Sequence, residues 1–386
     1  MSWQKVMLKE VGVIYTGSTP KTNDASLFNG EYPFVTPSDL FGAEPIVKTD
    51  RSLSEKGVQV STLLPAGSVL VCCIGSLGKI GIAGKSLVTN QQINAVVFDS
   101  SKVDYRYGYY ACAELKKELQ TIAPATTVPI VNKSRFSELK IPLPPLAEQK
   151  RIAAILDKAD EIRRKREQTI AKLDQLAQSI FVEMFGDPVL NPKKWTSVKL
   201  GDLIFSASDG PHVSPSYVEI GIPFLSTRHV RPGEVIWKDL KYISADDAKL
   251  HWKKCKPIFG DILYSKGGTT GYAAVVRTKQ EFAIWVHIAL LKPNFEKCNS
   301  VWLEHMLNSQ YCYRQSQELT HGIANRDLGL KRMVNILMYQ PPLALQEQFA
   351  TRINKLEQLK ANHIAALTQQ TELFASLQHQ AFTGNL

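Results

Sequence analysis

The stretch from Leu139 to Pro188 reads LKIPLPPLAEQKRIAAILDKADEIRRKREQTIAKLDQLAQSIFVEMFGDP. Its first prolines suit an extended approach and the first position of a helix, but not a helix interior. We therefore expect a helix to begin at about Leu146 and to end before Gly186-Asp187-Pro188, which is a helix stop signal. About 39 helical residues would extend for about 58 Å at 1.5 Å per residue. So long a helix in mid-chain is typical of a segment that spaces or clamps other parts.

The second half of the chain repeats the first. The opening Trp3–Leu8, WQKVML, is matched by Trp195–Leu200, WTSVKL. The strongest match is the helix itself, because Pro144–Ala147, PPLA, recurs as Pro341–Ala344 after 197 residues, and the match continues to the carboxyl terminus without a gap. A repeat of this length predicts two copies of one unit, each a globular part followed by a long helix.

Each globular part has the signals of a mixed α/β fold, in which short β-branched or aromatic runs alternate with turn residues and helical segments. We expect strands within 68–74, 95–98, 261–264, 272–277 and 282–291, and helices near 106–119 and 301–317. The predicted order is a first globular domain at 1–142, a central helix at 143–186, a second globular domain at 187–340 and a C-terminal helix at 341–386. The predicted fold class is α/β, with two similar mixed domains separated by two long helices.

The two helices carry matching apolar stripes, which predict that they pack against each other like a coiled coil. Because each helix leaves a different globular part, we expect them to run antiparallel, with both termini near the first globular part and a pseudo-twofold axis at the middle. The predicted seam comprises Ile152, Leu156, Ile162, Arg166, Ile170, Leu173 and Ile180 of the first helix, and Ile353, Leu356, His363, Leu367, Phe374 and Leu377 of the second.

Two polar residues interrupt these stripes at equivalent positions, Arg166 in the first helix and His363 in the second. An antiparallel pair would bring them together near the midpoint, where polar groups can fix the register of a seam. The alternative is that Arg166 extends from the edge of the seam and that His363 is merely tolerated.

The composition favours a polyanionic partner without requiring one. Lys and Arg number 46 against 36 Asp and Glu, a formal net charge of +10, although many basic proteins bind no nucleic acid. The six cysteines form no CxxC pair and no ligand cluster with histidine, which is typical of reduced, mostly buried thiols. With no secretion signal at the amino terminus and no apolar run of membrane-spanning length, we expect a soluble cytoplasmic protein.

Several catalytic motifs are missing from the sequence. Ala83-Gly84-Lys85-Ser86 resembles the end of a phosphate-binding loop, but Lys79 stands where that motif requires glycine. Asn191-Pro192-Lys193-Lys194 lacks the second proline and the aromatic residue expected in an amino-methyltransferase. There is no HExxH, no GxSxG and no carboxylate cluster at metal-binding spacing. We therefore expect no enzymatic activity and no metal site in this chain alone.

The remaining polar signals favour a DNA-binding surface. The loops Gly75–Gly81, GSLGKIG, and Ser265–Gly271, SKGGTTG, are expected to present backbone N–H groups and a lysine to phosphate, or else to be tight turns. The amides of Asn90–Gln92 can pair with adenine edges, or serve as turn and cap residues. The candidate DNA-binding residues are Thr19, Lys21, Lys79, Asn90, Gln91, Gln92, Thr126, Asn132, Lys133 and Arg135 in the first copy, and His212, Arg228, His229, Lys266, Thr269, Thr270, Asn325 and Arg326 in the second.

Equivalent places in the two copies carry different polar side chains. This is the pattern expected if one framework binds two different half-sequences, although plain divergence would also produce it. The basic run Arg163–Arg166 is flanked by Glu161 and Glu167, so we interpret it as a solvated helix face with i,i+4 ion pairs and not as a DNA contact.

The helix motif IPLPPLAEQKRIAAILDKADEI, the following SIFVEMFGDPVLNPKKW, the second PPLALQEQFA and the two WxxVxL openings closely resemble the specificity subunit of Type I restriction–modification systems. The resemblance implies two target-recognition domains, each binding one half of a bipartite sequence in double-stranded DNA, with helices that set the gap. It also implies two modification subunits that use S-adenosylmethionine to methylate adenine, and restriction subunits that use ATP and Mg. This chain would bind no cofactor. The second motif departs from the first by reading PPLALQEQ instead of PPLAEQKR.

Half-sites one helical turn apart need binding parts separated by about 34–36 Å. A rod of about 58 Å can supply one to one and a half turns, so we expect about 3 to 5 specified base pairs in each half and a gap of about 5 to 8. Two alternatives from other classes stay open: a coiled-coil scaffold whose globular domains bind proteins, and a self-sufficient DNA methyltransferase or nuclease.

Overall fold

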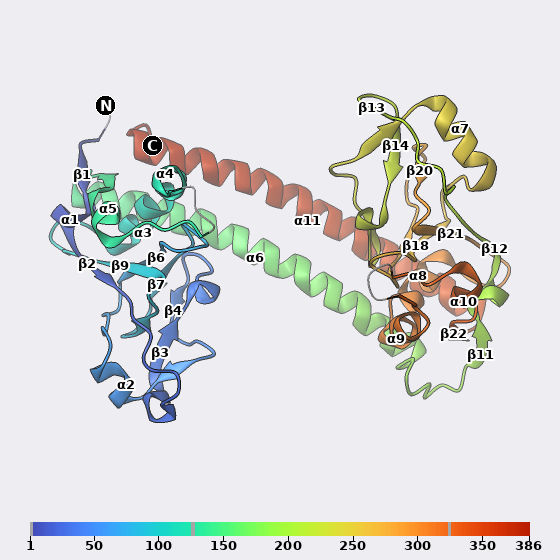
Figure 1. The fold of residues 1–386 in the computed structure, drawn as a ribbon, viewed down its shortest axis with the longest axis horizontal. Coiled ribbons are helices and arrows are strands. Elements are labelled where there is room, and N and C mark those ends of the chain that lie inside the picture. Colours follow the sequence, from blue (N-terminus) through green and yellow to red (C-terminus); the bar gives the residue numbers. More distant parts are fainter. Residues whose placement is uncertain (1–2, 125–127, 323–325) are drawn as a thin grey trace. The chain divides into compact units, whose positions relative to one another are not determined.

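A computed structural model describes residues 3–124, 128–322 and 326–386 of the chain. They form two compact units. The first unit comprises Met1–Gln168 and Ile364–Leu386, and the second comprises Thr169–His363. Each unit contains one globular part together with a part of both long helices (Figure 1).

The two long helices have the limits that their flanking residues predict. Helix α6 (Leu146–Phe185) begins directly after the prolines and has 40 residues. It ends before Gly186, whose φ of 82° is in the left-handed region that favours glycine. Helix α11 (Leu343–Thr383) likewise follows two prolines and has 41 residues. The predicted start near Leu146 and the predicted stop at Gly186 are confirmed.

In the first unit the two helices run antiparallel. Arg151, near the start of α6, donates to the carbonyl of Leu386 at 2.8 Å, whereas Arg163, further along α6, lies over the ring of Phe374 at 6.0 Å. The indole N–H of Trp3 donates to the carbonyl of Ala381 at 2.9 Å. The predicted meeting of the two ends of the chain at the first globular part is therefore confirmed.

The second unit shows the same antiparallel arrangement. Asp174 of α6 pairs with Lys360 of α11 at 2.6 Å. Further along α6, the ring of Phe181 meets that of Phe349, which is earlier in α11, with centroids 5.6 Å apart. The predicted pairing of Arg166 with His363 stays a prediction.

The first globular part contains a five-stranded sheet, a three-stranded sheet and a two-stranded ribbon. In spatial order, the strands of the larger sheet are β2 (Gly12–Thr16), β9 (Ile93–Phe98), β6 (Val69–Cys72), β7 (Ile80–Ala83) and β4 (Pro45–Ile46). Those of the smaller sheet are β5 (Ser52–Leu53), β3 (Phe28–Val35) and β8 (Val88–Thr89). The ribbon pairs β1 (Lys5–Met7) with β10 (Lys140–Pro142). Its helices are α1 (Leu8–Val11), α2 (Glu55–Gln59), α3 (Tyr105–Glu114), α4 (Lys116–Ile122) and α5 (Lys133–Glu138).

The second globular part has two four-stranded sheets and two two-stranded ribbons. In spatial order, the strands of one sheet are β12 (Ile204–Asp209), β21 (Ile288–Pro293), β18 (Ile262–Ser265) and β19 (Ala273–Val275). Those of the other are β13 (Tyr217–Val218), β17 (Lys241–Ile243), β14 (Ile222–Leu225) and β20 (Ala283–Ile284). The ribbons pair β11 (Thr196–Lys199) with β22 (Leu337–Gln340), and β15 (Val230–Arg231) with β16 (Glu234–Val235). Its helices are α7 (Ala245–Lys254), α8 (Ser300–Leu307), α9 (Gln310–Glu318) and α10 (Leu330–Met333).

The sheet topology confirms the internal repeat. The order β2-β9-β6-β7 of the first unit recurs as β12-β21-β18-β19 in the second. The parallel pair β3–β8 likewise recurs as β14–β20. The expected fold class is therefore confirmed. Each unit contains one mixed α/β part, the two parts are similar, and the portions of the two long helices within each unit run antiparallel.

Three predicted elements are divided in the structure. The helix expected at 106–119 is interrupted at Leu115 between α3 and α4. The helix expected at 301–317 breaks between α8 and α9, because the side chain of Asn308 bonds both backbone groups of Ala273 and Ser309 caps α9. The run 282–291 forms two strands, β20 and β21, separated by Trp285–His287.

In each unit, one hydrophobic cluster is shared by the globular part and the long helices. In the first unit, Tyr107 and Tyr110 of α3 pack against Phe382 and Phe374 of α11, with ring centroids 5.7 and 6.2 Å apart. In the second, Trp302 of α8 lies in one cluster with residues of α6 and α11. The globular parts are thus packed directly onto the helices. All six cysteines are buried free thiols, as predicted.

The predicted seam residues contribute to these cores to different extents. Ile152, Leu156 and Ile353 are buried. The partly buried ones are Arg166, Ile170, Leu173, Ile180, Leu356, His363, Leu367, Phe374 and Leu377. The prediction is wrong for Ile162, which is 42% exposed, because α6 buries Asp160 at this level and residues two apart on a helix point in nearly opposite directions. None of the helices in the described residues combines the length and apolar character needed to cross a membrane.

Candidate nucleic-acid interface

Four segments at one end of the larger sheet come together in the first unit. They are residues 16–19 after β2, residues 73–79 between β6 and β7, residues 90–92 before β9, and residues 128–131; we call them the first loop cluster. The N–H of Cys73 donates to the carbonyl of Gln92 at 2.7 Å, and that of Val131 donates to the carbonyl of Cys73 at 2.9 Å. The N–H of Gly75 donates to Pro129 at 3.0 Å. Backbone hydrogen bonds therefore hold the glycine-rich loop between its neighbours.

The second unit builds the same cluster from equivalent segments. We call residues 209–212, 266–272, 285–287 and 326–328 the second loop cluster. The N–H of Lys266 donates to His287 at 2.9 Å, that of Leu328 donates to Lys266 at 2.8 Å, and that of Gly268 donates to Arg326 at 2.9 Å. Each bond has its counterpart in the first cluster, so one backbone framework occurs twice.

The first cluster brings Thr19 together with the three predicted amides. The hydroxyl of Thr19 donates to Oε1 of Gln91 at 2.6 Å, and both residues are exposed. Asn90 is 8% exposed, and its amide donates to Oε1 of Gln92 at 2.9 Å. Asn90 therefore acts as a turn residue that supports Gln92, and Gln91 is the amide that faces solvent.

The three predicted lysines of the first unit, Lys21, Lys79 and Lys133, are exposed. Lys21 is exposed, and Lys79 is exposed with its ammonium 3.4 Å from the carbonyl of Pro37. Asn132 caps α5 by accepting from the N–H of Arg135 at 2.9 Å. Lys133 and Arg135 are exposed on the same helix, which follows the cluster directly. Of the remaining candidates, Thr126 and Asn325 lie outside the described residues.

The second cluster presents a different set of side chains. His212, Thr269 and Arg326 are exposed. Thr270 is 2% exposed, and its hydroxyl is 3.1 Å from that of Thr320. Thr270 therefore supports the loop, while the other three face solvent.

The structure contradicts the predicted exposure of Lys266. Its residue exposure is 5%, and its ammonium lies 3.2 Å from Asp209 and 3.3 Å from Asp327. The prediction was wrong because both carboxylates are remote from Lys266 in the sequence. The local sequence, a lysine within a glycine-rich loop, therefore predicted an exposed phosphate-binding site. The ammonium is instead buried and ion-paired with both carboxylates.

The predicted role of His229 in DNA binding is also inconsistent with its position. His229 is 2% exposed, and its ring accepts from the N–H of Ser226 at 2.8 Å. Burial lowers the pKa of His229, and the charge of Arg228 lowers it further. The ring is therefore a neutral capping group. Arg228 remains exposed, with its guanidinium bonded to the carbonyl of Asp239 at 2.7 Å.

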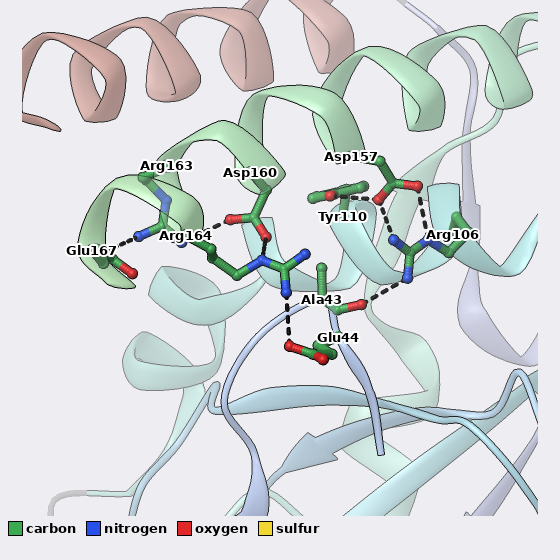
Figure 2. A network of polar contacts seen from close by, with 9 residues as sticks. All are labelled: Ala43, Glu44, Arg106, Tyr110, Asp157, Asp160, Arg163, Arg164 and Glu167. Carbon is green, nitrogen blue, oxygen red and sulfur yellow. Dashed lines mark hydrogen bonds and ion pairs between the residues drawn. The ribbon is translucent and has the colours of Figure 1, made fainter. Parts of the chain in front are cut away.

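The basic run of α6 forms ion pairs, as expected, but also joins the globular part. Arg163 pairs with Asp160 at 2.7 Å and with Glu167 at 2.8 Å. Arg164 pairs with Asp160 at 2.9 Å and with Glu44 of the globular part at 3.0 Å. Figure 2 shows these contacts, which leave little of Arg163 and Arg164 free for DNA.

One turn earlier in α6, Asp157 forms a bidentate ion pair with Arg106 of α3. The two nitrogen–oxygen distances are 2.9 and 2.6 Å, and the hydroxyl of Tyr110 donates to the same carboxylate at 2.7 Å (Figure 2). Planar pairs of this kind are stronger and more directional than single contacts. The network therefore fixes the first globular part on α6.

Sequence reasoning missed Trp285 and His287. They occupy the places of Asn90 and Gln92, since each set directly precedes the strand that pairs with β6 or β18. Trp285 is partly buried and His287 is exposed. Alignment of the repeat across these loops would have found them. In the described part of the chain, no three His, Cys, Asp or Glu side chains converge as metal ligands.

Comparisons with known proteins agree with this architecture. A family model described as the Type I restriction modification DNA specificity domain matches residues 1–175. The MjaIX specificity subunit of Methanocaldococcus jannaschii is 28% identical over 61% of this chain and 59% of the relative. The MjaVIII specificity subunit of the same organism is 22% identical over 92% of this chain and 86% of the relative. The EcoBI specificity subunit of Escherichia coli is 23% identical over 77% of this chain and 69% of the relative.

Solved structures share the fold along the whole chain. The S subunit of a Type I restriction–modification system from M. genitalium superimposes with a TM-score of 0.63 at 16% identity, covering 99% of this chain and 96% of that one. A chain from a structure of type I R-M complex assembly has a TM-score of 0.54 at 20% identity, covering 100% and 98%. The chain is therefore similar in sequence to Type I restriction–modification specificity subunits, with the family match over residues 1–175, and it shares the fold of the solved S subunit.

Proposed function

We propose that this chain is the DNA-recognition subunit of a Type I restriction–modification enzyme, and that each globular part binds one half of a bipartite target. The observation that carries the proposal is the pair of loop clusters. Their backbone hydrogen bonds match, while Gln91 and Gln92 of the first are replaced by Val286 and His287 in the second. One framework that carries two different sets of side chains is suited to two different half-sequences.

The long helices are proposed to set the gap between the halves. A 40-residue helix extends for about 60 Å, and half-sites one helical turn apart require about 34–36 Å. The helices therefore have the length to separate two DNA-binding parts by one turn or more. We expect a gap of about 5 to 8 base pairs with about 3 to 5 specified base pairs on each side.

Two modification subunits are the proposed partners of the helices. Ile162 and Leu359 occupy equivalent places in the repeat and are 42% and 44% exposed. Leu176 and Leu373 are also equivalent and are 45% and 56% exposed. Each unit thus presents one apolar residue from α6 and one from α11, which supports docking of two identical partners.

Catalysis is proposed to lie on the partner subunits. S-adenosylmethionine would bind to the modification subunits, and ATP with Mg would bind to the restriction subunits. This chain would supply recognition of double-stranded DNA. The lack of catalytic motifs in its sequence supports this division.

The test is co-expression of the full chain with its modification subunit, followed by genome-wide mapping of methylated adenine. The proposal expects one bipartite motif with a fixed gap, and binding to that duplex that weakens steeply as salt is raised. Methyl transfer by the chain alone would establish a self-sufficient methyltransferase instead. Absence of duplex binding, or binding that does not respond to salt, would favour the protein-binding scaffold.

A further inference from the structure

An ion network with a buried centre, Lys266 and Asp209, joins the segments of the second loop cluster. Lys266 is at its centre, with its ammonium 3.2 Å from Oδ2 of Asp209 and 3.3 Å from Oδ1 of Asp327. Lys254 also bonds Asp209, and Arg332 lies 3.6 Å from Asp327. Burial raises the pKa of Asp209, but the hydrogen bonds from Lys254 and Lys266 outweigh it and hold that pKa below its usual value. The carboxylate therefore stays ionised.

The first unit has no charge at the equivalent place. Cys73 stands where Lys266 stands, since both follow the strand that pairs with the equivalent neighbours β9 and β21. Burial raises the pKa of the Cys73 thiol to about 12, so the thiol is neutral. Beside it, the hydroxyl of Thr16 donates to Asn94 at 2.7 Å. The shared backbone framework thus forms without an ion network, and the network must have a separate role in the second unit.

That role concerns the segment that carries Arg326. Asp327 is bonded through its backbone to His321 in both directions at 2.9 Å, and its carbonyl accepts from Arg332 at 2.9 Å. Its carboxylate is 46% exposed, while Asp209 is only 9% exposed. The ammonium of Lys266 thus links a buried strand end to an exposed loop, in addition to the backbone hydrogen bonds from Leu328 to Lys266 and from Gly268 to Arg326. Without its charge the two carboxylates, both within 3.3 Å of the ammonium, would repel each other.

We propose that Lys266 is a positioning residue for recognition of one half-site, because it ties Asp327, and with it the 326–328 segment, to the end of β12. This inference rests on the proposed function of the second unit as a DNA-binding part. Lys266 would not touch DNA. It would keep Asp327 away from the phosphates and hold Arg326 at a fixed place on the loop cluster.

The decisive variant is Asp327→Asn. It keeps the shape of the side chain and leaves the pair of Lys266 with Asp209 intact. It also removes the 3.6 Å ion pair with Arg332, but the bond from Arg332 to the backbone carbonyl of Asp327 remains, so we expect the fold to be retained. Lys266→Met removes the link from the other side, and Lys266→Arg preserves the charge. Lys256→Met is the matched control, because it removes an equal charge from an exposed pair with Glu281 in the same unit.

The measurement is binding of the full complex with its modification subunits to the mapped target and to duplexes with one base pair changed in either half. Asp327→Asn and Lys266→Met should each reduce discrimination in one half by about fivefold or more, the lower range for one base contact. Discrimination in the other half should be unchanged. The double variant should be no worse than the poorer single variant, and Lys266→Arg should restore discrimination that a merely structural loss would not recover.

Equal loss in both halves, or no loss in either, overturns the positioning role while leaving the proposed function in place. A fivefold loss with Lys256→Met would also overturn it, because general charge would then explain the effect. If the unaltered complex discriminates in neither half, the proposed function itself fails, and the two failures are distinguishable.

Discussion

Gln149 and Gln346 make the same hydrogen bonds at the starts of the two long helices. Oε1 of Gln149 accepts from the N–H of Asp104 at 2.9 Å, and Oε1 of Gln346 accepts from the N–H of Asn299 at 2.9 Å. Each Nε2 also donates, at 2.8 Å, to the carbonyl of the proline five residues earlier. Asp104 and Asn299 cap the first helix of the same motif in each globular part. One glutamine therefore joins each globular part to the helix that follows it.

This relationship also explains why the motif differs between its two copies. In PPLAEQ and PPLALQ the glutamine keeps its place, whereas Glu148 of the first is replaced by Leu345. Glu148 pairs with Arg151 on the surface at 2.7 Å. The buried amide is thus common to both copies, whereas its partly buried neighbour differs.

The first prediction concerns the energy of this contact. Gln149→Ala leaves the N–H of Asp104 and the carbonyls of Lys102 and Pro144 without their partner. We expect a loss of about 1–3 kcal/mol in the free energy of unfolding, measured by chemical denaturation with circular dichroism. Hydrogen exchange at the start of α3 should accelerate at the same time. Gln175→Ala, on the exposed face of α6, is the control and should stay within about 0.5 kcal/mol; an equal effect of both changes would argue against a special role for Gln149.

The second prediction concerns acid stability. Burial lowers the pKa of His305, with Arg277 lowering it further and Glu304 opposing. Its ring contacts those of Phe181 and Phe349 at 6.3 and 5.0 Å. The imidazole of His305 therefore binds a proton more readily in the unfolded chain than in the folded one. Its contribution to the free energy of unfolding is fully present above about pH 6.5 and is lost as the pH falls toward the lower pKa of the folded state.

His305→Tyr, which introduces the residue that the first unit has as Tyr110, should make this acid-side loss shallower. Tryptophan fluorescence is a suitable probe, because five of the six tryptophans lie in the second unit. The control is His379→Gln on the exposed face of α11. An unchanged slope below pH 6.5 in His305→Tyr would show that this ring does not couple to folding.

The third prediction concerns the gap. Four residues inserted after Ala171 and after Thr368, which are equivalent positions, add about 6 Å to each helix and nearly preserve the face of the apolar stripe. At 3.4 Å per base pair along one strand, the gap should lengthen by about one to two base pairs. Mapping of methylated adenine on plasmid targets with graded gaps measures this, with the uninserted chain as reference. If the preferred gap is the same in both proteins, the helices do not set it.

The fourth prediction concerns the partners. Ile162→Lys combined with Leu373→Lys places charge on the proposed docking residues of the first unit only. We expect complexes with one modification subunit in place of two, because burying an unpaired ammonium is costly. Light scattering of the purified complex gives the stoichiometry. The mirrored change, Leu359→Lys with Leu176→Lys, should give the same result, and retention of two partners in both would move the docking surface elsewhere.

Local chemistry is the part of the structure that could be predicted. Prolines before Leu146 and glycine at 186 act within a few residues, and the helical period repeats every turn, so the limits of α6 are visible in the sequence. The repeat made the second helix and the second globular part predictable from the first. Strand order could not be derived, since β2 pairs with β9 across a long stretch of intervening chain.

The candidate site shows the same division. The sequence by itself determined that glycine-rich and amide-rich loops recur at equivalent places, because residue type and spacing are properties of the chain. Only the tertiary structure decided which of those side chains face solvent. Lys266 and Asp327 are 61 residues apart in the chain and 3.3 Å apart in space. From the sequence alone, a lysine beside glycines is predicted to be an exposed cation. It is buried and ion-paired in the structure because folding brings two distant carboxylates to its ammonium.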